Sequence, residues 1–403
     1  MATKPRAVVV GAGIGGLSAG AKLAREGFEV EVFEKNYEIG GRFRNLEYEG
    51  YELTSGALHM IPHGATGPLG RILDDVGADV EIVECDPAAK IRFEDDRDDV
   101  PMNEYVFGKY GLVKNALWYL RAWYGLMRGR NLDDITSGEM RDVADAFCGW
   151  SCSLTAEEMP VDEIYAIMKN TKKYGMPGVP KGGCSGVVDA LADVVESEGG
   201  EIHTRHEVEA IDEGEITVDG ETVEADYVIS NAGHRITARL MGDDDYLEEA
   251  ESRPPSPGIK MSLGVDEPLL GYNGILFAPD AERIDGINEV THADPSLAPD
   301  GKHLTEAHMS WNPDEETAGE AIRKAKSDLE DIFPDADYEI LLSQGYKGDW
   351  PVNRVANGYK AGTETPIDDV YVVGDAAKGK GGIEVEGIAM GVNDVVDDII
   401  TTT

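Results

Sequence analysis

The chain has 403 residues, 41% of them hydrophobic, and a formal net charge of -42 from 78 acidic and 36 basic residues. This length and composition allow a large buried core and predict two domains. The charge argues against nucleic acid as a partner, because phosphate groups would be repelled across most of the surface. Acidic residues are scattered through every surface segment, which favours a halophilic protein solvated in concentrated salt over an ordinary acidic cytosolic protein.

Targeting, cysteine and histidine patterns predict a cytoplasmic protein without a metal site. The sequence enters a β-branched run directly after MATKPR, which leaves no room for a signal peptide, and no apolar run is as long as a transmembrane helix. The cysteines form no CxxC motif and no disulfide framework, as expected in a reducing compartment. Pairs such as His203 and His206, or His303 and His308, have odd offsets that would point their side chains to opposite faces of a strand.

The segment from Ala7 to Lys35 has the parts of a dinucleotide-binding βαβ unit in the right order. A strand, a helix and a second strand are predicted at residues 7–10, 17–26 and 29–33. The turn after the first strand has GxGxxG spacing, with its glycines at Gly11, Gly13 and Gly16. These glycines permit a tight turn, a close approach of the backbone to a pyrophosphate, and close packing of the helix on its strand. Glu34 ends the second strand at the distance where a carboxylate binds a ribose hydroxyl.

Segments rich in strands and glycine recur along the chain and predict a discontinuous domain. We expect this domain to comprise residues 1–75, 182–252 and 346–403. Residues 76–181 are mostly helical and aromatic in pattern, whereas residues 253–345 alternate as short strands with one helix near 315–333. These two segments should pack together as a second domain over the cofactor. The predicted fold class is α/β, a Rossmann-type domain with a second α+β substrate domain.

Five motifs carry a resemblance to a known family. They are the Rossmann start, the GGR of residues 40–42, PKGGCSGVVDAL (180–191), EADYVISNAG (224–233) and VYVVGDAAKGKGGIEVEGIAMG (370–391). Together they resemble the phytoene desaturase branch of the FAD-dependent amine oxidase superfamily. The resemblance spans nearly the whole chain, and it is more specific for the cofactor than for the substrate.

The resemblance implies an extended FAD. Glu34 would bind the adenosine ribose, and the Val208 backbone would contact the adenine. Arg42 would lie at the pyrophosphate, and Asp375 at the ribityl or pyrophosphate end. The backbone at residues 382–384 would meet the flavin pyrimidine edge, where reduced flavin gathers negative charge. The predicted cofactor-binding residues are Gly11, Ala12, Gly13, Ile14, Gly15, Gly16, Glu34, Lys35, Gly41, Arg42, Gly56, Ala57, Leu58, Val208, Gly374, Asp375, Gly382 and Ile383.

Two positions depart from the pattern of the family. An aspartate is common in the family two positions before the glycine that matches Gly56, and here that position is Thr54. The family's PxGGM motif ends here in Cys184. Each departure indicates either a different substrate or nothing.

Three residues are candidates for catalysis: His59, Lys378 and Glu384. The resemblance places His59 beside the flavin ring as a proton carrier, and the alternative is a histidine satisfied in a turn. Lys378, or Lys380 in the same loop, would either offset charge on reduced flavin or be solvated. Glu384 and Glu386 would either carry protons or complement the N-terminus of the last helix.

The sequence therefore predicts an FAD-dependent oxidoreductase acting on carbon-carbon bonds of a hydrophobic, isoprenoid or carotenoid-like substrate, by desaturation or saturation. No second nucleotide fingerprint follows, which argues against tightly held NAD(P), so the electron partner would be oxygen, a quinone or a soluble carrier. An amine oxidase is the main alternative, with Trp350 as the evident candidate for an aromatic cage. A flavin-dependent isomerase and a non-catalytic prenyl-binding protein of the same fold are further alternatives.

Residues 105–132 are basic, whereas the chain as a whole is strongly acidic. They contain no acid and five cations: Lys109, Lys114, Arg121, Arg128 and Arg130. On a helix, three of these cations form one stripe, and Val113, Leu117, Leu120, Tyr124 and Met127 cover another face. This layout predicts an interfacial helix resting on the inner membrane face, where it would open a substrate channel to lipid. The alternative is a domain helix whose apolar faces are core and whose cations pair with neighbouring acids.

Overall fold

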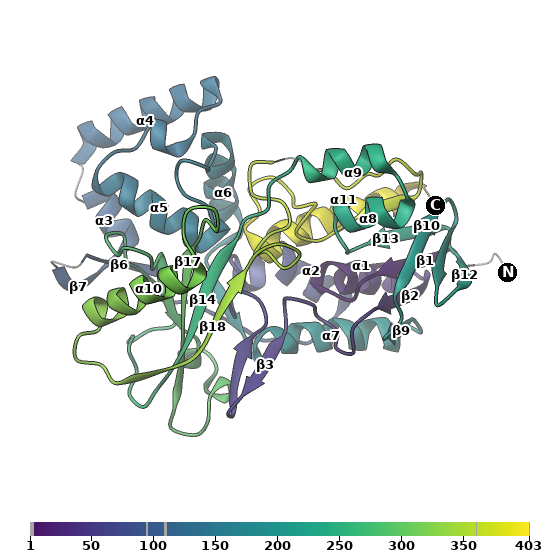
Figure 1. Ribbon diagram of the computed structural model, residues 1–403, viewed down its shortest axis with the longest axis horizontal. Coiled ribbons are helices and arrows are strands. Elements are labelled where there is room, and N and C mark those ends of the chain that lie inside the picture. The colour runs from purple at the N-terminus through teal and green to yellow at the C-terminus, as the bar shows by residue number, and fades with distance from the viewer. Residues whose placement is uncertain (1–3, 94–95, 109–110, 360, 403) are drawn as a thin grey trace.

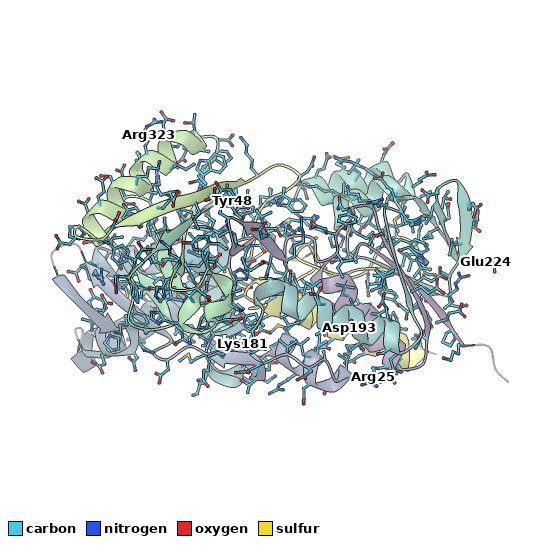
Figure 2. The ribbon with its side chains drawn as sticks, turned by 90° about the horizontal axis from the view of Figure 1, so that it is seen from below. Arg25, Tyr48, Lys181, Asp193, Glu224 and Arg323 are labelled. Atoms are coloured by element: carbon cyan, nitrogen blue, oxygen red, sulfur yellow. The ribbon has the colours of Figure 1, made fainter. Side chains whose placement is uncertain are left out.

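The computed structural model describes residues 4–93, 96–108, 111–359 and 361–402. The description of side chains omits residues 96–98, 106–108 and 111–119. Two large sheets lie at opposite ends of the molecule (Figure 1). Arg323, on a helix beside one sheet, and Glu224, in a small sheet beside the other, mark these two ends in Figure 2.

The first sheet is a parallel, five-stranded Rossmann sheet. In spatial order its strands are β19 (Val370–Val372), β13 (Tyr227–Ser230), β1 (Arg6–Val10), β2 (Glu29–Glu34) and β9 (Glu201–Thr204). Every neighbouring pair is parallel. The strands lie within a few residues of the predicted βαβ unit, but helix α1 (Ile14–Arg25) begins three residues earlier than predicted, directly at the glycine turn.

Alternate residues of β1 pack against different layers of this part of the molecule. Ala7 and Val9 belong to a core shared with α1 and with the helices α2 (Pro68–Val76), α7 (Gly183–Ser197) and α11 (Glu384–Thr402). Val8 and Val10 belong to a second core under a three-stranded sheet. That sheet comprises β10 (Val208–Asp212), β11 (Glu215–Val218) and β12 (Glu221–Glu224). The helices α8 (His234–Met241) and α9 (Asp244–Glu251) follow β13. The parallel sheet is therefore covered on both faces, as parallel sheets require.

The second sheet has seven strands. In spatial order they are β18 (Tyr338–Tyr346), β14 (Gly258–Val265), β17 (His303–Ser310), β16 (Gly286–Glu289), β15 (Ile275–Phe277), β6 (Ala89–Phe93) and β7 (Asp96–Pro101). All pairs are antiparallel except β15 with β6. Helix α10 (Ala318–Ile332) packs against one face. The sequence pattern did not predict β6, β7 and β18. The first two are rich in charged residues, and β7 and β18 are the two edge strands of the sheet.

Helices beside the seven-stranded sheet form the remaining layer (Figure 1). They are α3 (Met102–Gly108), α4 (Gly111–Arg128), α5 (Glu139–Cys152) and α6 (Val161–Tyr174). Two small strand pairs complete the fold: β3 (Asn45–Tyr48) with β4 (Tyr51–Thr54), and β5 (Ile82–Glu84) with β8 (Gly178–Pro180). The chain passes repeatedly between the two sheets, and the predicted domain boundaries stay a prediction.

Candidate active site

One cavity of about 1250 Å³ is lined by residues from both large sheets. One end is lined by the glycine turn after β1 and by Val208, and the other end by Trp150, Phe277 and Met176. Pockets for single drug-sized ligands hold about 300–1,000 Å³. The cavity therefore has room for an extended dinucleotide and for part of a second molecule.

The glycine turn fits a pyrophosphate because it has no space for side chains. Gly11 has a φ of 95°, which favours glycine. A Cβ on Gly13 would meet the Asn231 side chain, and one on Gly16 would meet the Gly11 carbonyl oxygen. No side chain caps α1. The first-turn N–H groups of α1 therefore stay available to an anionic ligand beside Gly13 and Ile14, which line the cavity.

Glu34 is buried at the end of β2 and lines the same end of the cavity. Its Oε2 accepts a hydrogen bond from the Ala12 backbone N–H at 2.9 Å, and its Oε1 accepts one from the Asn36 N–H at 2.9 Å. Two backbone donors thus fix the carboxylate beside the glycine turn. Its position suits the predicted bond to a ribose hydroxyl.

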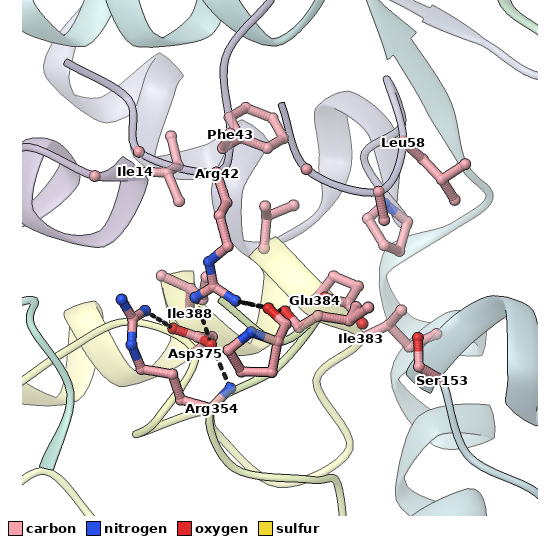
Figure 3. A pocket seen from close by; sticks show the side chains of 18 of the residues that line it. Ile14, Arg42, Phe43, Leu58, Ser153, Arg354, Asp375, Ile383, Glu384 and Ile388 are labelled. Atoms are coloured by element: carbon pink, nitrogen blue, oxygen red, sulfur yellow. Dashed lines mark hydrogen bonds and ion pairs between the residues drawn. The ribbon is translucent and has the colours of Figure 1, made fainter. Parts of the chain in front are cut away.

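Arg42 and Asp375, which are far apart in sequence, form an ion pair (Figure 3). Arg42 Nη2 lies 2.6 Å from Asp375 Oδ2, and Arg354 Nη1 lies 2.8 Å from Asp375 Oδ1. Burial raises the pKa of Asp375, but the two arginines outweigh this effect and hold that pKa well below its ordinary value. Arg42 also donates to the carbonyl oxygen of Val352 at 2.8 Å. This charged cluster lines the cavity, where a cation suits a pyrophosphate.

The N-terminus of α11 contributes Ile383 and Glu384 to the cavity wall (Figure 3). Glu384 has a φ of 44°, and its Oε1 accepts a hydrogen bond from Asn353 Nδ2 at 2.9 Å. Of the three residues predicted to present backbone N–H groups, Gly382 is engaged within the chain, because its N–H donates to the Gly379 carbonyl oxygen at 3.0 Å. Burial raises the pKa of Glu384.

The predicted lysine and the second glutamate lie outside the cavity lining. Lys378 Nζ donates to Asn353 Oδ1 at 2.8 Å and to Asn357 Oδ1 at 2.6 Å, so it supports Glu384 through Asn353. Lys380 is exposed and pairs with an aspartate of α6. Glu386 is fully buried and accepts hydrogen bonds from the backbone N–H groups of His63, before α2, and Leu69, in the first turn of α2. Burial raises the pKa of Glu386 to about 7.

His59 is fully buried and is not among the residues that line the cavity. Its Nε2 donates to the Glu52 carbonyl oxygen at 2.7 Å, and its Nδ1 accepts from the Cys184 N–H at 3.1 Å. Burial lowers the pKa of His59 and keeps the ring neutral. This geometry matches the alternative inferred from the sequence, a histidine satisfied in a turn. Cys184, where the sequence departs from the family motif, is therefore in direct contact with His59.

Sequence reasoning missed a buried ion pair next to His59. Lys260 on β14 and Glu306 on β17 are both fully buried, with Lys260 Nζ at 3.7 Å from Glu306 Oε1. Lys260 Nζ also donates to the Thr54 carbonyl oxygen at 2.8 Å, and Glu306 Oε2 accepts from the His59 N–H at 3.1 Å. Burial lowers the pKa of Lys260 to about 8. The available signal was a charged residue in the middle of each of these two predicted strands.

The predicted site residues fall into two groups: those that line the cavity and those that lie behind the lining. Those that line the cavity are Gly11, Gly13, Ile14, Glu34, Lys35, Gly41, Arg42, Gly56, Ala57, Leu58, Val208, Asp375, Ile383 and Glu384. Those behind the lining are Ala12, Gly15, Gly16, Gly374, Gly382, His59 and Lys378. The glycines behind the lining act by permitting close packing. A Cβ on Gly15, for example, would lie 2.8 Å from Asn231 Oδ1.

The Rossmann sheet, its glycine turn and the cavity define an FAD-dependent oxidoreductase. Residues 112–387 match the family model of flavin-containing amine oxidoreductases, and residues 9–76 match an NAD(P)-binding Rossmann-like domain. The chain belongs to the flavin-containing amine oxidoreductase family, in its phytoene desaturase-like branch.

Relatives of known sequence or structure cover most of the chain. The crystal structure of an oxidoreductase from Methanosarcina mazei is 41% identical, covers 97% of this chain and 100% of its own, and has a TM-score of 0.91. An uncharacterized protein of Methanocaldococcus jannaschii is 41% identical over 404 residues, 97% of this chain and 98% of its own. The zeta-carotene-forming phytoene desaturase of Myxococcus xanthus is 28% identical over 371 residues, 74% of this chain and 70% of its own.

Proposed function

We propose that the protein uses FAD to desaturate or saturate carbon-carbon bonds of a hydrophobic, isoprenoid substrate. The observation that carries the proposal is the continuity of the cavity, which runs from the glycine turn to a wall of aromatic and aliphatic side chains. The similarity to the phytoene desaturase of Myxococcus xanthus supports the same class of substrate.

The apolar end of the cavity favours a hydrophobic molecule. The Phe147 and Phe277 rings lie 6.1 Å apart, and Trp150 is buried beside them in one core cluster. The charged residues that line this end, Glu84, Asp86 and Lys172, are exposed. They therefore belong to the rim, and the walls that would hold the body of a substrate are largely apolar.

In desaturation, two carbon-hydrogen bonds break and a carbon-carbon double bond forms. Bound FAD supplies the acceptor for the hydride, which carries both electrons. The second hydrogen leaves as a proton, and Glu384 is the candidate base, because its carboxyl lines the cavity and, within the described part of the chain, accepts a hydrogen bond from Asn353 alone. Saturation runs these steps in reverse. In desaturation, oxygen, a quinone or a soluble carrier would accept the electrons of reduced FAD, and in saturation a reduced quinone or soluble carrier would supply them.

The geometry around Trp350 disfavours an amine oxidase. An amine oxidase would need an aromatic cage, but the Arg42 guanidinium lies 5.9 Å from the Trp350 ring centroid and occupies one face. A cation in that place would repel a protonated amine. A flavin-dependent isomerase and a prenyl-binding protein differ from the proposal by showing no net reduction of the flavin.

Anaerobic mixing of the FAD-loaded protein with candidate substrates tests the proposal. We expect a polyprenyl substrate to bleach the flavin absorbance, or its polyene to reoxidise the reduced protein, and we expect putrescine to do neither. Glu384→Gln should slow bleaching about 10²- to 10⁴-fold with FAD retained, whereas Asp394→Asn, on an exposed part of α11, should not. Bleaching by putrescine alone would replace the proposal with an amine oxidase.

We further propose that α4 rests on an anionic membrane, from which the substrate enters. None of the described helices combines the length and the apolar character needed to cross a bilayer, so the contact would be peripheral. Four apolar side chains of α4 are more than half exposed: Leu120, Trp123, Tyr124 and Met127. Ala122 and Leu126 pack inward against the core under α5 and α6. The alternative interpretation required these outward residues to be part of the core, but they are exposed.

Basic residues accompany this apolar face. Arg121 and Arg128 are exposed on α4, and the Arg128 guanidinium lies 5.5 Å from the Tyr124 ring centroid. Neighbouring α6 exposes Lys172 and Met168, which also line the cavity. In a chain of net charge -42, a basic and apolar patch beside a cavity fits an anionic bilayer. Lys109 lies outside the described residues, as do the side chains of Val113, Lys114, Leu117 and Trp118.

Flotation with vesicles that contain anionic lipid tests the membrane contact. We expect the wild type to float with vesicles, and Leu120→Glu with Trp123→Glu to remain in the soluble fraction. Tyr37→Glu with Tyr48→Glu, at two exposed aromatic residues outside α4, carries the same charge change and should still float. A wild type that never floats, at low salt or high, would exclude the membrane as partner.

A further inference from the structure

A chain of polar side chains runs from the cavity wall to α6. Glu384 lines the cavity, and its Oε1 accepts a hydrogen bond from Asn353 Nδ2 at 2.9 Å. Lys378 Nζ donates to Asn353 Oδ1 at 2.8 Å and to Asn357 Oδ1 at 2.6 Å. Asn357 Nδ2 donates in turn to Oε1 of Glu163, in the first turn of α6, at 3.2 Å. Asn353, Asn357 and Glu163 are at most 5% exposed, so these contacts are shielded from water.

Lys378 determines how the two amides are oriented. An ammonium group has three donors and no acceptor, so it binds the oxygen atom of each amide and leaves the amide N–H groups to other partners. Those N–H groups face Glu384 and Glu163, which accept their hydrogen bonds. A donor aimed at a carboxyl oxygen favours the ionised carboxylate. One cation thus supports two carboxylates through two amides.

Several titratable groups surround Glu384. Burial raises the pKa of Glu384, and Lys378 opposes this effect most strongly. Asp375 raises the same pKa and Arg42 lowers it, but these two residues already pair with each other at 2.6 Å. Cys152 of α5 also lies near, and burial raises the pKa of its thiol, which is therefore uncharged. Lys378 is thus the main counter-charge of Glu384.

The loop from Lys378 to Glu384 is packed tightly between two helices. A Cβ on Gly381 would lie 2.6 Å from the Ala166 Cβ of α6. A Cβ on Gly387 of α11 would lie 2.9 Å from Lys378 Cβ. Glu384 itself has a left-handed φ of 44°, a conformation that favours glycine. Such a residue persists where its surroundings hold it in place. The packing therefore fixes Lys378 and Glu384 relative to each other.

We propose that Lys378 is a positioning residue, which holds Glu384 as an ionised carboxylate on the cavity wall through Asn353. Lys378 lies behind the cavity lining, so it acts through Glu384 and not by contact with a ligand. In desaturation the carboxylate takes the proton, and Lys378 then extends the reaction to lower pH. The removal of a proton from a substrate rests on the proposed function, whereas the effect of Lys378 on Glu384 does not.

Infrared titration of the FAD-loaded protein tests the inference without a substrate. A protonated carboxyl has a C=O stretch that the carboxylate lacks, and the part of this signal that is missing in Glu384→Gln belongs to Glu384. We expect Lys378→Gln to raise the midpoint of this titration by about one to three pH units, the range for losing a neighbouring opposite charge. Lys378→Met should give a similar shift, and Lys378→Arg, which keeps the charge, should stay near the wild type. Lys380→Gln removes the same charge from an exposed lysine of the same loop and is the matched control.

The pH dependence of anaerobic flavin bleaching by a polyprenyl substrate is the second readout. We expect the low-pH limb to move upward in Lys378→Gln by the same amount, with a rate near that of the wild type at high pH. Damage to the packing alone would lower the rate at every pH and leave the midpoint in place. An unchanged carboxyl midpoint in Lys378→Gln, or an equal shift in Lys380→Gln, would overturn the role of Lys378. A shifted carboxyl midpoint without bleaching at any pH would uphold that role and reject the proposed function.

Discussion

In the parallel sheet the polar residues of the site follow the ends of strands, whereas in the seven-stranded sheet they lie within strands. Glu34 ends β2 and Asp375 follows β19 closely, so each takes part in a loop at the cavity. Lys260 lies inside β14, and Glu306 and His308 lie inside β17. Polar residues at strand ends can be predicted from local sequence motifs. Polar residues within strands acquire partners only when strands from distant parts of the chain pair.

The largest expected effect breaks the buried pair within the second sheet. Glu306→Leu leaves the Lys260 ammonium buried without a counter-charge and should cost about 3–5 kcal/mol of unfolding free energy. Lys260→Met combined with Glu306→Leu should recover much of this loss. Denaturant unfolding of the FAD-loaded protein measures both. Glu282→Leu, which breaks an exposed pair with Lys324, is the control and should cost at most about 1 kcal/mol. An equally small loss for Glu306→Leu would show that the buried pair has no special role.

A smaller effect should follow from the strand-end residues. Arg42→Ala removes a cation from the cavity but leaves Asp375 paired with Arg354, so FAD affinity should fall by about 1–3 kcal/mol while the fold persists. Fluorescence of released FAD gives the dissociation constant. Arg44→Ala removes a neighbouring arginine that pairs with Glu38 and should leave the affinity unchanged. Equal constants for Arg42→Ala and the wild type would remove Arg42 from the cofactor site.

His59 contacts both regions. Its N–H donates to Glu306 of the second sheet, and its ring accepts from the Cys184 N–H of α7. His59→Ala leaves the Cys184 N–H and the Glu52 carbonyl oxygen unpaired and should cost about 1–3 kcal/mol of stability. Turnover per bound flavin should stay near that of the wild type. Parallel unfolding and flavin-reduction measurements decide the point. A fall of about 10²-fold or more in reduction rate at unchanged stability would restore the catalytic role first predicted for His59.

The smallest expected effect comes from a change of salt concentration, which acts on the charges of both regions. At 1 M salt the screening length is about 3 Å, and at 0.01 M it is about 30 Å, so the net charge of -42 repels itself across the molecule when salt is low. We expect the unfolding midpoint to rise continuously with KCl. A midpoint that is flat from millimolar to molar KCl would contradict the halophilic interpretation.

The difference between the regions also explains what the sequence could predict. The βαβ unit, FAD and the family followed from short motifs, because Gly11, Gly13 and Gly16 each have a mechanical purpose within one turn. The pairing of Lys260 with Glu306 depends on the register of β14 against β17, which no local pattern specifies. His59 was placed in the pocket by analogy, but its orientation is set by Cys184 and Glu52.

The central claim is that the apolar end of the cavity holds the substrate against the flavin, and Phe277 tests it most directly. Phe277 lines this end and packs beside Phe147. Rates of anaerobic flavin bleaching by a polyprenyl substrate are compared at equal bound FAD for the wild type, Phe277→Leu and Phe277→Asp. The account predicts near-normal bleaching for Phe277→Leu and a loss of about 100-fold or more for Phe277→Asp, since a carboxylate there opposes an apolar ligand. Equal rates in all three proteins would contradict it and place the substrate elsewhere.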